Sequence, residues 1–382
     1  MEIRELPFFQ TFECLGGKCP ETCCRGWIIP LEAEDAKRMK QERGLLGLRL
    51  FLATYARTRD SFNSDSNVCP FFTREGLCGL QLKKGHDFLP EACRSYPRFY
   101  RNYDLFEERM LDLSCIGAAR LWFANCRDLT FTVHDGTPDS GRCCSNDDPA
   151  FLQALLSCRE QMKDALFAVQ KTGDLVYTLH ALDCYAEQVQ AAFLNGNTDY
   201  LTKHPFEAYV KTAGEPVDTR FIFPYEGSLY HDLLRTHLYA DRLSFANPTL
   251  YELCHYYMDA ESSFRPFVKK WPDLVMSFFE RYPHYAPYYA ALFAYYLYQH
   301  FLDTYDDYSF RRCIRMGLVH LNMILLFDVL YEQENKGFGD DDFARIIAVY
   351  NRRAHYNDQI KDEMYRVVED AEMNATKRSF AN

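Results

Sequence analysis

Residues 12–27 read FECLGGKCPETCCRGW and carry four cysteines: Cys14, Cys19, Cys23 and Cys24. Two glycines and a proline lie between these cysteines, so the chain is expected to turn sharply rather than continue as a helix or strand. Adjacent cysteines in such turns are poorly suited to a hydrophobic core. Sharply turning loops are, in contrast, what brings several thiolates to one metal ion or cluster. The stretch therefore predicts an irregular, metal-binding beginning to the fold.

A second group of cysteines follows in residues 69–78, which read CPFFTREGLC, in CRSYPR at 93–98 and in LDLSC at 111–115. Eight thiols exceed the four that one tetrahedral or cubane site uses, so either some are spare or two sites exist. His86 is the only histidine between the first and last of them, which favours an all-thiolate site and leaves zinc and iron–sulfur both open. The candidate metal ligands are Cys14, Cys19, Cys23, Cys24, Cys69, Cys78, Cys93 and Cys115.

The remaining cysteines follow other patterns. The four that come late in the chain fall on apolar faces of helical patterns, which is typical of buried free thiols acting as small hydrophobic side chains: Cys158, Cys184, Cys254 and Cys313. The sequence leaves Cys126, Cys143 and Cys144 undecided between the two roles. The chain begins MEIRELPFFQTFECLGG, without an apolar signal segment, so we expect a cytoplasmic protein with reduced thiols.

The composition disfavours several classes of protein. Apolar residues make up 48% and charged residues 25% of the 382 residues, and 30 Phe with 27 Tyr are incompatible with general disorder. The net charge of −11 disfavours a nucleic-acid surface, and no run of eighteen uncharged apolar residues predicts a membrane span. Most of the negative charge lies in residues 151–382, which indicates either a solvated acidic face or a surface that attracts lysine-bearing partners.

The sequence after residue 148 is helical in pattern. Residues 133–148 are rich in Gly, Pro, Ser, Asp and Asn, which indicates a linker, and Asp148 with Pro149 then provides a helix cap and a first-turn proline. Apolar residues recur every three or four positions in 152–169, 175–193, 225–243, 250–259, 264–281, 287–302, 310–331, 342–350 and 357–371. Earlier in the chain we expect helices from Pro30 toward Gly44 and over residues 104–125, and no segment shows the alternation of a strand.

These patterns together predict a mainly α fold. An irregular cysteine-rich unit that binds a metal ion or iron–sulfur cluster is expected over residues 1–132, and an all-helical domain over residues 149–382, with the linker between them.

The cysteine motifs also resemble a known family. The pattern F-x-C-x4-C-x3-CC-x-G-W, followed by CPFF, LCGLQ, CRSYPR and LDLSC with an Ala-Ala-Arg helix, is similar to that of flagellin lysine-N-methylases. The similarity runs from Phe12 to Arg120, about a third of the chain. The shorter cysteine core also resembles small zinc- or iron-chelating domains.

The resemblance implies transfer of methyl groups from S-adenosylmethionine to lysine ε-amines of flagellin, with an iron–sulfur cluster taking part. The C-x3-C-x2-C fingerprint of radical enzymes is absent because Gly26 stands where its third cysteine would be, and no glycine-rich nucleotide loop occurs. We therefore expect the methyl donor to bind at the cysteine site, where Arg94, Tyr96 and Arg98 are the candidate cofactor-binding residues.

Two further groups are open to more than one interpretation. Tyr96, Asp112 and His86 are candidate bases for a lysine amine or ordinary turn residues, and the tyrosine-rich run over residues 282–298 is either a cradle for a methylated ammonium or helix core. The arginines Arg94 and Arg98 could clamp a carboxylate or pair with thiolates. The alternative to a methyltransferase is a non-enzymatic zinc- or iron-binding interaction module.

Overall fold

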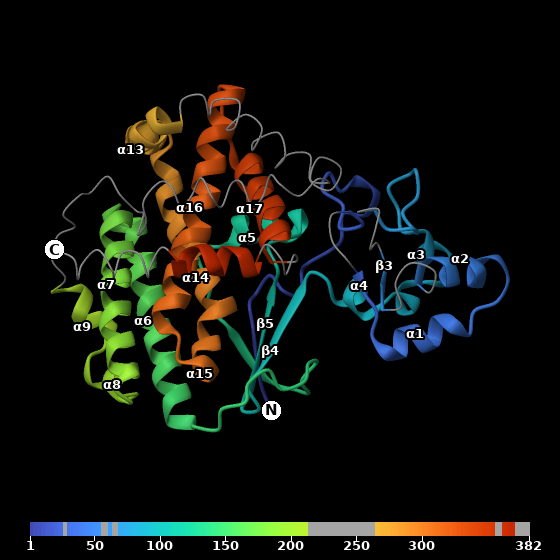
Figure 1. The fold of residues 1–382 in the computed structure, drawn as a ribbon, viewed down its shortest axis with the longest axis horizontal. Helices are drawn as coiled ribbons and strands as arrows, with labels where there is room; N and C mark the ends of the chain where they lie inside the picture. The colour runs from blue at the N-terminus through green and yellow to red at the C-terminus, as the bar shows by residue number, and fades with distance from the viewer. Residues whose placement is uncertain (26–28, 55–59, 63–67, 213–263, 356–360, 371–382) are drawn as a thin grey trace.

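The computed structural model describes residues 1–25, 29–54, 60–62, 68–212, 264–355 and 361–370. Figure 1 shows a small lobe carrying α1–α4, a larger body of long helices, and strands that run between the two. The expected helices over residues 225–243 and 250–259, together with Cys254, lie outside the described residues.

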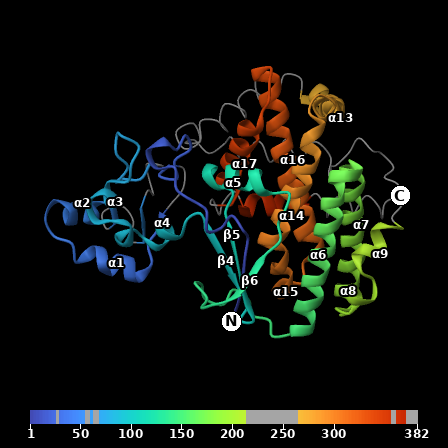
Figure 2. The ribbon, with the colours of Figure 1, turned by 180° about the vertical axis from the view of Figure 1, so that it is seen from behind.

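A four-stranded sheet lies against the helical body, which corrects the prediction that no strands would occur. The strands are β1 (Glu2–Glu5), β4 (Arg98–Asn102), β5 (Phe106–Leu111) and β6 (Thr132–Asp135). Their order is β4-β5-β1-β6, with β1 parallel to β5 and the other two pairs antiparallel. Figure 2, from behind, shows β6 on the other side of β5 from the small lobe.

The helix expected over residues 104–125 was wrong in its first half. Residues 106–111 form the central strand β5, and helix α5 begins only at Ile116 and ends at Asn125. All six residues of β5 are buried, so its sequence FEERML lacks the apolar–polar alternation of a half-exposed strand. Its three charged residues are buried in ion pairs, which sequence patterns do not reveal.

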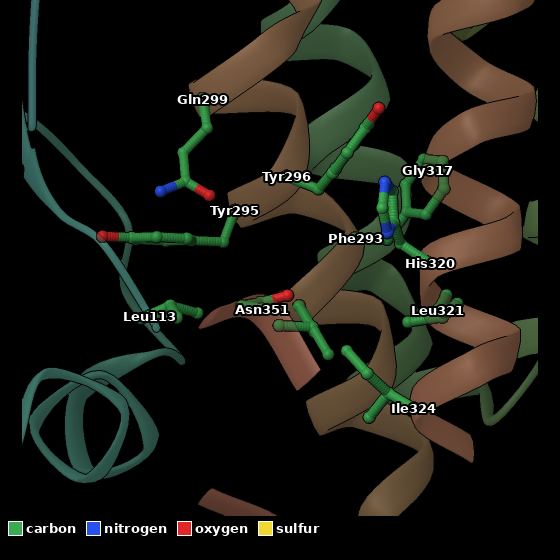
Figure 3. Close-up of a pocket in the computed structure, with 11 residues that line it drawn as sticks. Leu113, Phe293, Tyr295, Tyr296, Gln299, Gly317, His320, Leu321, Ile324 and Asn351 are labelled. Atoms are coloured by element: carbon green, nitrogen blue, oxygen red, sulfur yellow. The ribbon is translucent and has the colours of Figure 1, made fainter. Parts of the chain in front are cut away.

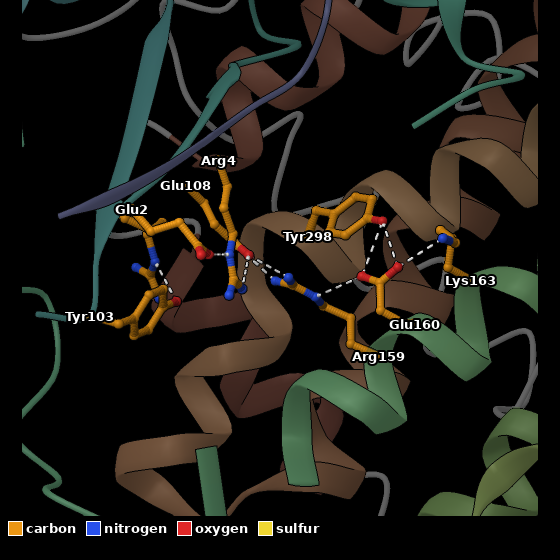
Figure 4. Close-up of polar contacts among 9 residues, drawn as sticks. Glu2, Arg4, Tyr103, Glu108, Arg159, Glu160, Lys163 and Tyr298 are labelled. Carbon is orange, nitrogen blue, oxygen red and sulfur yellow. Dashed lines mark hydrogen bonds and ion pairs between the residues drawn. The ribbon is translucent and has the colours of Figure 1, made fainter. Parts of the chain in front are cut away.

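One of these ion pairs joins the sheet to the helical body (Figure 4). Arg159 of α6 (Pro149–Thr172) donates from Nη1 to Oε2 of Glu108 at 2.8 Å and also pairs with Oε1. Both side chains are almost fully buried, and the guanidinium carbon lies 4.7 Å from the centre of the Tyr298 ring. A buried charge is tolerated only when it is paired in this way.

The helical body confirms most of the predicted helices. The cap of α6 is as expected: Oδ1 of Asp148 accepts hydrogen bonds from the backbone N–H groups of Ala150 and Phe151, both at 3.0 Å. Residues 361–370 are also helical. The other elements are α7 (Leu175–Leu194), α8 (Tyr200–Lys203), α9 (Phe206–Val210), α13 (Phe264–Arg281), α14 (Ala286–His300), α15 (Thr304–Asp307), α16 (Phe310–Asn335) and α17 (Asp340–His355).

Helix α16 is long and apolar enough to cross a membrane by length and composition alone. Within the described residues it is the one such helix, and 83% of its most apolar window is buried inside the protein. Burial of this kind is also typical of the central helix of a globular core.

The small lobe contains short elements around a core of its own. They are β2 (Ile29–Pro30), α1 (Ala33–Lys40), α2 (Gly44–Thr54), β3 (Ser61–Phe62), α3 (Gly79–Lys84) and α4 (Glu91–Ser95). The core comprises Ile29, Leu31, Met39, Leu50, Phe62, Cys69, Phe71, Leu80 and Leu89. The sheet and α5 instead contribute side chains to the core of the helical body. The domain boundary at residues 133–148 stays a prediction.

Candidate functional site

The structure gathers the predicted metal ligands where the small lobe meets the helical body. Cys24 hydrogen-bonds with the thiols of Cys23 and Cys69, and it lies within electrostatic range of Cys78. A backbone hydrogen bond also joins the two segments that carry these thiols: the N–H of Cys69 donates to the carbonyl oxygen of Cys24 at 2.8 Å. We call the eight cysteines of this region the thiol cluster: Cys14, Cys19, Cys23, Cys24, Cys69, Cys78, Cys93 and Cys115.

Three segments far apart in the sequence supply the thiol cluster. Cys93 on α4 lies within electrostatic range of Cys23, Cys24 and Cys78, and Cys115, the residue before α5, lies within range of Cys23 and Cys19. Cys23 and Cys24 pack against the small core, whereas Cys19 and Cys115 pack against the core of the helical body. The cluster therefore spans the junction of the two lobes.

Five thiols of the cluster have a raised pKa and so resist deprotonation in the absence of a cation: Cys19, Cys23, Cys24, Cys93 and Cys115. Burial, together with the neighbouring thiols Cys23 and Cys19, raises the pKa of Cys115 to about 12. The hydrogen bond with Cys23 lowers the pKa of Cys24, but the hydrogen bond with Cys69 and burial outweigh it and raise that pKa to about 12. Among the described residues, no group of three or more Cys, His, Asp or Glu side chains stands in a metal-coordinating arrangement.

A buried arginine that sequence reasoning missed holds the loops of this site together. Arg352 of α17 is 4% exposed, and its Nη2 donates to the carbonyl oxygens of Glu21 at 2.8 Å and Ser114 at 3.1 Å. Its positive charge lowers the pKa of Cys23, although the hydrogen bond with Cys24 and burial raise that pKa more strongly. Because Arg352 is more than 230 residues from either loop, no local motif could have identified it.

The three predicted cofactor-binding residues lie in different environments. Tyr96 faces the cluster, with its hydroxyl 3.1 Å from Oγ of Ser114, and burial raises the pKa of this phenol well above its usual value. Arg94 pairs with Glu91 and donates to the carbonyl oxygen of Asp87 at 3.1 Å. Arg98 instead lies over the rings of two buried phenylalanines, Phe9 and Phe12.

The candidate bases are also separated by the fold. Asp112 is 5% exposed, and its Oδ1 accepts the backbone N–H of Ser114 at 2.7 Å, which places the carboxylate in the loop between β5 and α5. His86 is exposed on the short turn after α3. Asp112 and Tyr96 therefore lie near the thiol cluster through their shared neighbour Ser114, and the structure shows no such link for His86.

The cysteines outside the cluster have mixed environments. Cys158 is buried, which confirms the prediction that it is a buried free thiol. Cys126, for which the sequence left the role undecided, is also buried. Cys313 and Cys184 were also predicted to be buried free thiols, and they are only partly buried. Cys144 is partly buried and Cys143 is exposed.

The tyrosine-rich run is largely helix core. The hydroxyls of Tyr285 and Tyr295 donate to Oδ1 of Asp340 at 2.7 Å and to the carbonyl oxygen of Leu111 at 2.6 Å. Tyr289 and Tyr298 are likewise buried, and they donate to carboxylates on α16 and α6.

Comparison with known proteins gives distant relatives. The chain is 25% identical over 122 residues to proteins named lysine-N-methylase from Salmonella typhimurium and Salmonella choleraesuis, and this match covers 30% of each chain. It is 25% identical over 126 residues to the flagellar biosynthetic protein FliU of Salmonella muenchen, covering 30% of this chain and 72% of the relative. The chain thus spans less than a third of the lysine-N-methylases that it matches. No protein-family model and no solved structure matches.

Proposed function

We propose that this protein is a protein-lysine N-methyltransferase that methylates flagellin, with S-adenosylmethionine as methyl donor and an iron–sulfur cluster in the thiol cluster. The observation that carries the proposal is the convergence of cysteines from residues 14–24, 69–93 and 115 on one junction of the fold. The distant similarity to proteins named lysine-N-methylase and FliU supports the reaction and the substrate.

The thiol cluster has the donor chemistry of a metal site, although no three of the described side chains already stand in a coordinating arrangement. Neighbouring, partly buried thiols disfavour each other's ionised form, and a bound cation reverses that effect because it deprotonates the thiols that it ligates. The buried charge of Arg352 offsets part of the negative charge that several thiolates bring. The cysteines that would hold the group are the eight of the thiol cluster. An iron–sulfur cluster supplies an iron that can take the amino-acid end of S-adenosylmethionine.

The chain's own residues would position the reactants. A lysine amine has a pKa of about 10.4 and must lose its proton before it attacks a methyl sulfonium. Burial next to a cationic methyl donor favours the neutral amine. Tyr96 and Asp112 both contact Ser114 beside the thiol cluster, so they are the groups best placed to orient an amine there.

Anaerobic purification with iron, sulfide and zinc analysis tests the cofactor. The proposal predicts a brown protein that contains iron and sulfide and absorbs at about 400 nm. Calorimetry should then show binding of S-adenosylmethionine, and this binding should be lost when the metal is removed. A colourless zinc protein that ignores S-adenosylmethionine would contradict the proposal and leave the non-enzymatic metal-binding module.

A further inference from the structure

Helix α2 of the small lobe exposes a stripe of large apolar side chains. Leu45 is 87% exposed, and Leu48, Phe51 and Leu52 are between 52% and 56% exposed. At 3.6 residues per turn these four side chains occupy about a third of the circumference of the helix. Leu50, on the opposite face, belongs to the core of the small lobe. We call the four exposed residues the apolar stripe; no other helix in the described part of the chain carries more than one such side chain.

A cleft of about 330 Å³ opens beside the apolar stripe, a size typical of binding sites. Leu48 and Phe51 of the stripe line it, together with Met39 from the end of α1. A Cβ at Gly47 would be 2.3 Å from the carbonyl oxygen of Glu42, so the turn between the helices can lie against α2 only because position 47 has no side chain. Figure 1 shows α1 and α2 at the end of the small lobe that points away from the helical body. Other small cavities, such as the one in Figure 3, lie inside the helical body.

The cleft carries positive charge, although the whole chain has a net charge of −11. Lys40 and Arg43 line it, and both side chains are exposed. Glu42 also lines it, but its Oε1 lies 2.7 Å from Nζ of Lys84, so this carboxylate is already paired. The N-terminal end of α2 adds a partial positive charge, and its first turn contains no acidic residue. A ligand that covers the stripe should therefore carry carboxylates at its edge.

Shape and charge together favour a protein helix as that ligand. From Leu45 to Leu52 the stripe is about 10 Å long, which matches two turns of a partner helix, and amphipathic helices bind such grooves through apolar residues three and four positions apart. A second copy of this chain fits less well, because a two-fold pair of α2 helices would bring Arg43 and Arg49 close to the same residues of the other copy. A lipid bilayer presents a flat surface, which would leave the cleft unfilled.

The apolar stripe and the thiol cluster are parts of the same lobe. Leu50 of α2 and Cys69 of the thiol cluster are members of one core, and Cys23 and Cys24 pack against it. A protein segment held on α2 is thus fixed to the lobe that carries these thiols. Such tethering raises the effective concentration of the rest of the bound protein at the thiol cluster.

We propose that the apolar stripe and its cleft dock an amphipathic helix of the substrate protein, flagellin, with acidic side chains next to Lys40 and Arg43. This inference rests on the proposed function and adds a docking surface outside the reaction site. Docking of this kind provides binding energy and specificity without touching the reacting atoms, so it affects the KM for flagellin rather than kcat.

Binding of flagellin to the full-length protein, measured by biolayer interferometry, tests the docking surface without the methyl donor. Leu48→Glu should raise the Kd at least tenfold, because it removes an apolar contact and places a carboxylate opposite an acidic helix. Leu194→Glu is the matched control, since it changes an 80% exposed leucine of α7 and the net charge by the same amount, and its Kd should equal that of the wild type. Equal binding by Leu48→Glu and the wild type would overturn the inference.

Two further measurements test the chemistry of the partner. Arg43→Glu should weaken binding more at about 50 mM than at about 300 mM salt, because salt screens the lost attraction. Hydrogen exchange should show protection of a helical segment of flagellin that combines apolar residues three or four apart with Asp or Glu. Protection of a basic or an extended segment would contradict an acidic helix.

The result is separable from the proposed function. If flagellin is methylated and Leu48→Glu changes neither its Kd nor its KM, the docking surface is wrong and the function stands. If Leu48→Glu abolishes flagellin binding but the wild type never methylates flagellin, the proposed function fails and the docking surface remains. A wild-type dimer that Leu48→Glu converts to a monomer in analytical ultracentrifugation, or binding of phosphatidylserine vesicles in place of flagellin, would also overturn the inference.

Discussion

Arg352 on α17 donates from Nη2 to the carbonyl oxygen of Ser114 at 3.1 Å, and its Nε lies 3.3 Å from the same oxygen. The same guanidinium reaches the carbonyl oxygens of Glu21 and Thr22. One side chain of the helical body therefore fixes two of the segments that carry the thiol cluster. The arrangement makes the geometry of the cluster depend on the last helices of the chain.

Arg352→Lys should destabilise the protein by about 2–4 kcal/mol, because an ammonium carries its three donors on one nitrogen and lacks the planar fork that reaches the carbonyl oxygens of Glu21, Thr22 and Ser114. Urea denaturation of wild type and variant measures the difference. Arg366→Met provides the control, since Arg366 forms exposed ion pairs with Glu363 and Asp370. Such pairs contribute about 0–1 kcal/mol. Equal effects at the two positions would contradict the role of Arg352.

The buried pair Arg159–Glu108 predicts a non-additive result. Arg159→Met alone should cost about 3–5 kcal/mol, because it removes the hydrogen-bonding partner of the buried Glu108 carboxylate and leaves only the looser ion pair with Arg4 at 3.9 Å. The double variant Arg159→Met/Glu108→Leu should recover much of that loss, since two apolar side chains carry no uncompensated charge. A double-mutant cycle from urea denaturation gives the coupling energy, and strictly additive losses would exclude the pair as the cause.

Glu107 predicts a loss of stability in acid. Burial alone would raise the pKa of its carboxyl, but hydrogen bonds from Asp139, Ser140 and Arg109 outweigh burial and lower it. Because the folded pKa is below that of the unfolded chain, the contribution is fully present above about pH 4.3 and is lost as the pH falls through the folded value. Glu107→Gln should cost about 1–3 kcal/mol at pH 7 and flatten the fall in stability toward pH 3.5. If the free energy of unfolding of Glu107→Gln depended on pH as that of the wild type does, the predicted role of Glu107 would be wrong.

The membership of the thiol cluster predicts which cysteine substitutions lower the metal content of the protein. Serine at Cys19, Cys23, Cys69 or Cys93 should lower the metal content and destabilise the small lobe, because metal-dependent units fold poorly without their metal. Serine at Cys158 or Cys313 should leave the metal content unchanged, since these thiols lie on helices of the body. Elemental analysis of the purified variants decides, and equal metal loss from both groups would rule out the assignment.

Local patterns were sufficient for much of the fold. The cap at Asp148 and the apolar periodicity after it predicted α6, because both signals lie within a few residues of the helix. Strand β5 was missed because its charges at Glu107, Glu108 and Arg109 are buried by partners from other elements. A half-exposed strand shows alternation, whereas a strand covered on both faces does not.

The candidate site was predictable only in part, for a similar reason. Clustered cysteines among glycines and prolines predicted that distant thiols would meet, and they meet at the junction of the lobes. Arg352 belongs to an ordinary helical pattern, so its role follows only from the loops that the fold places beside it. The metal and the methyl donor stay predictions.

Mass spectrometry of flagellin detects the transfer of methyl groups to its lysines. Flagellin is incubated without oxygen with metal-loaded protein and S-adenosylmethionine, then digested. The comparison sample contains the Cys93→Ser variant, at a temperature where circular dichroism shows that this destabilised variant is still folded and elemental analysis shows that it lacks metal. We expect gains of about 14 Da per methyl on lysine residues, present with the metal-loaded protein and absent with the variant. Unmodified flagellin in both samples, from a protein whose cluster is shown to be intact, would contradict it.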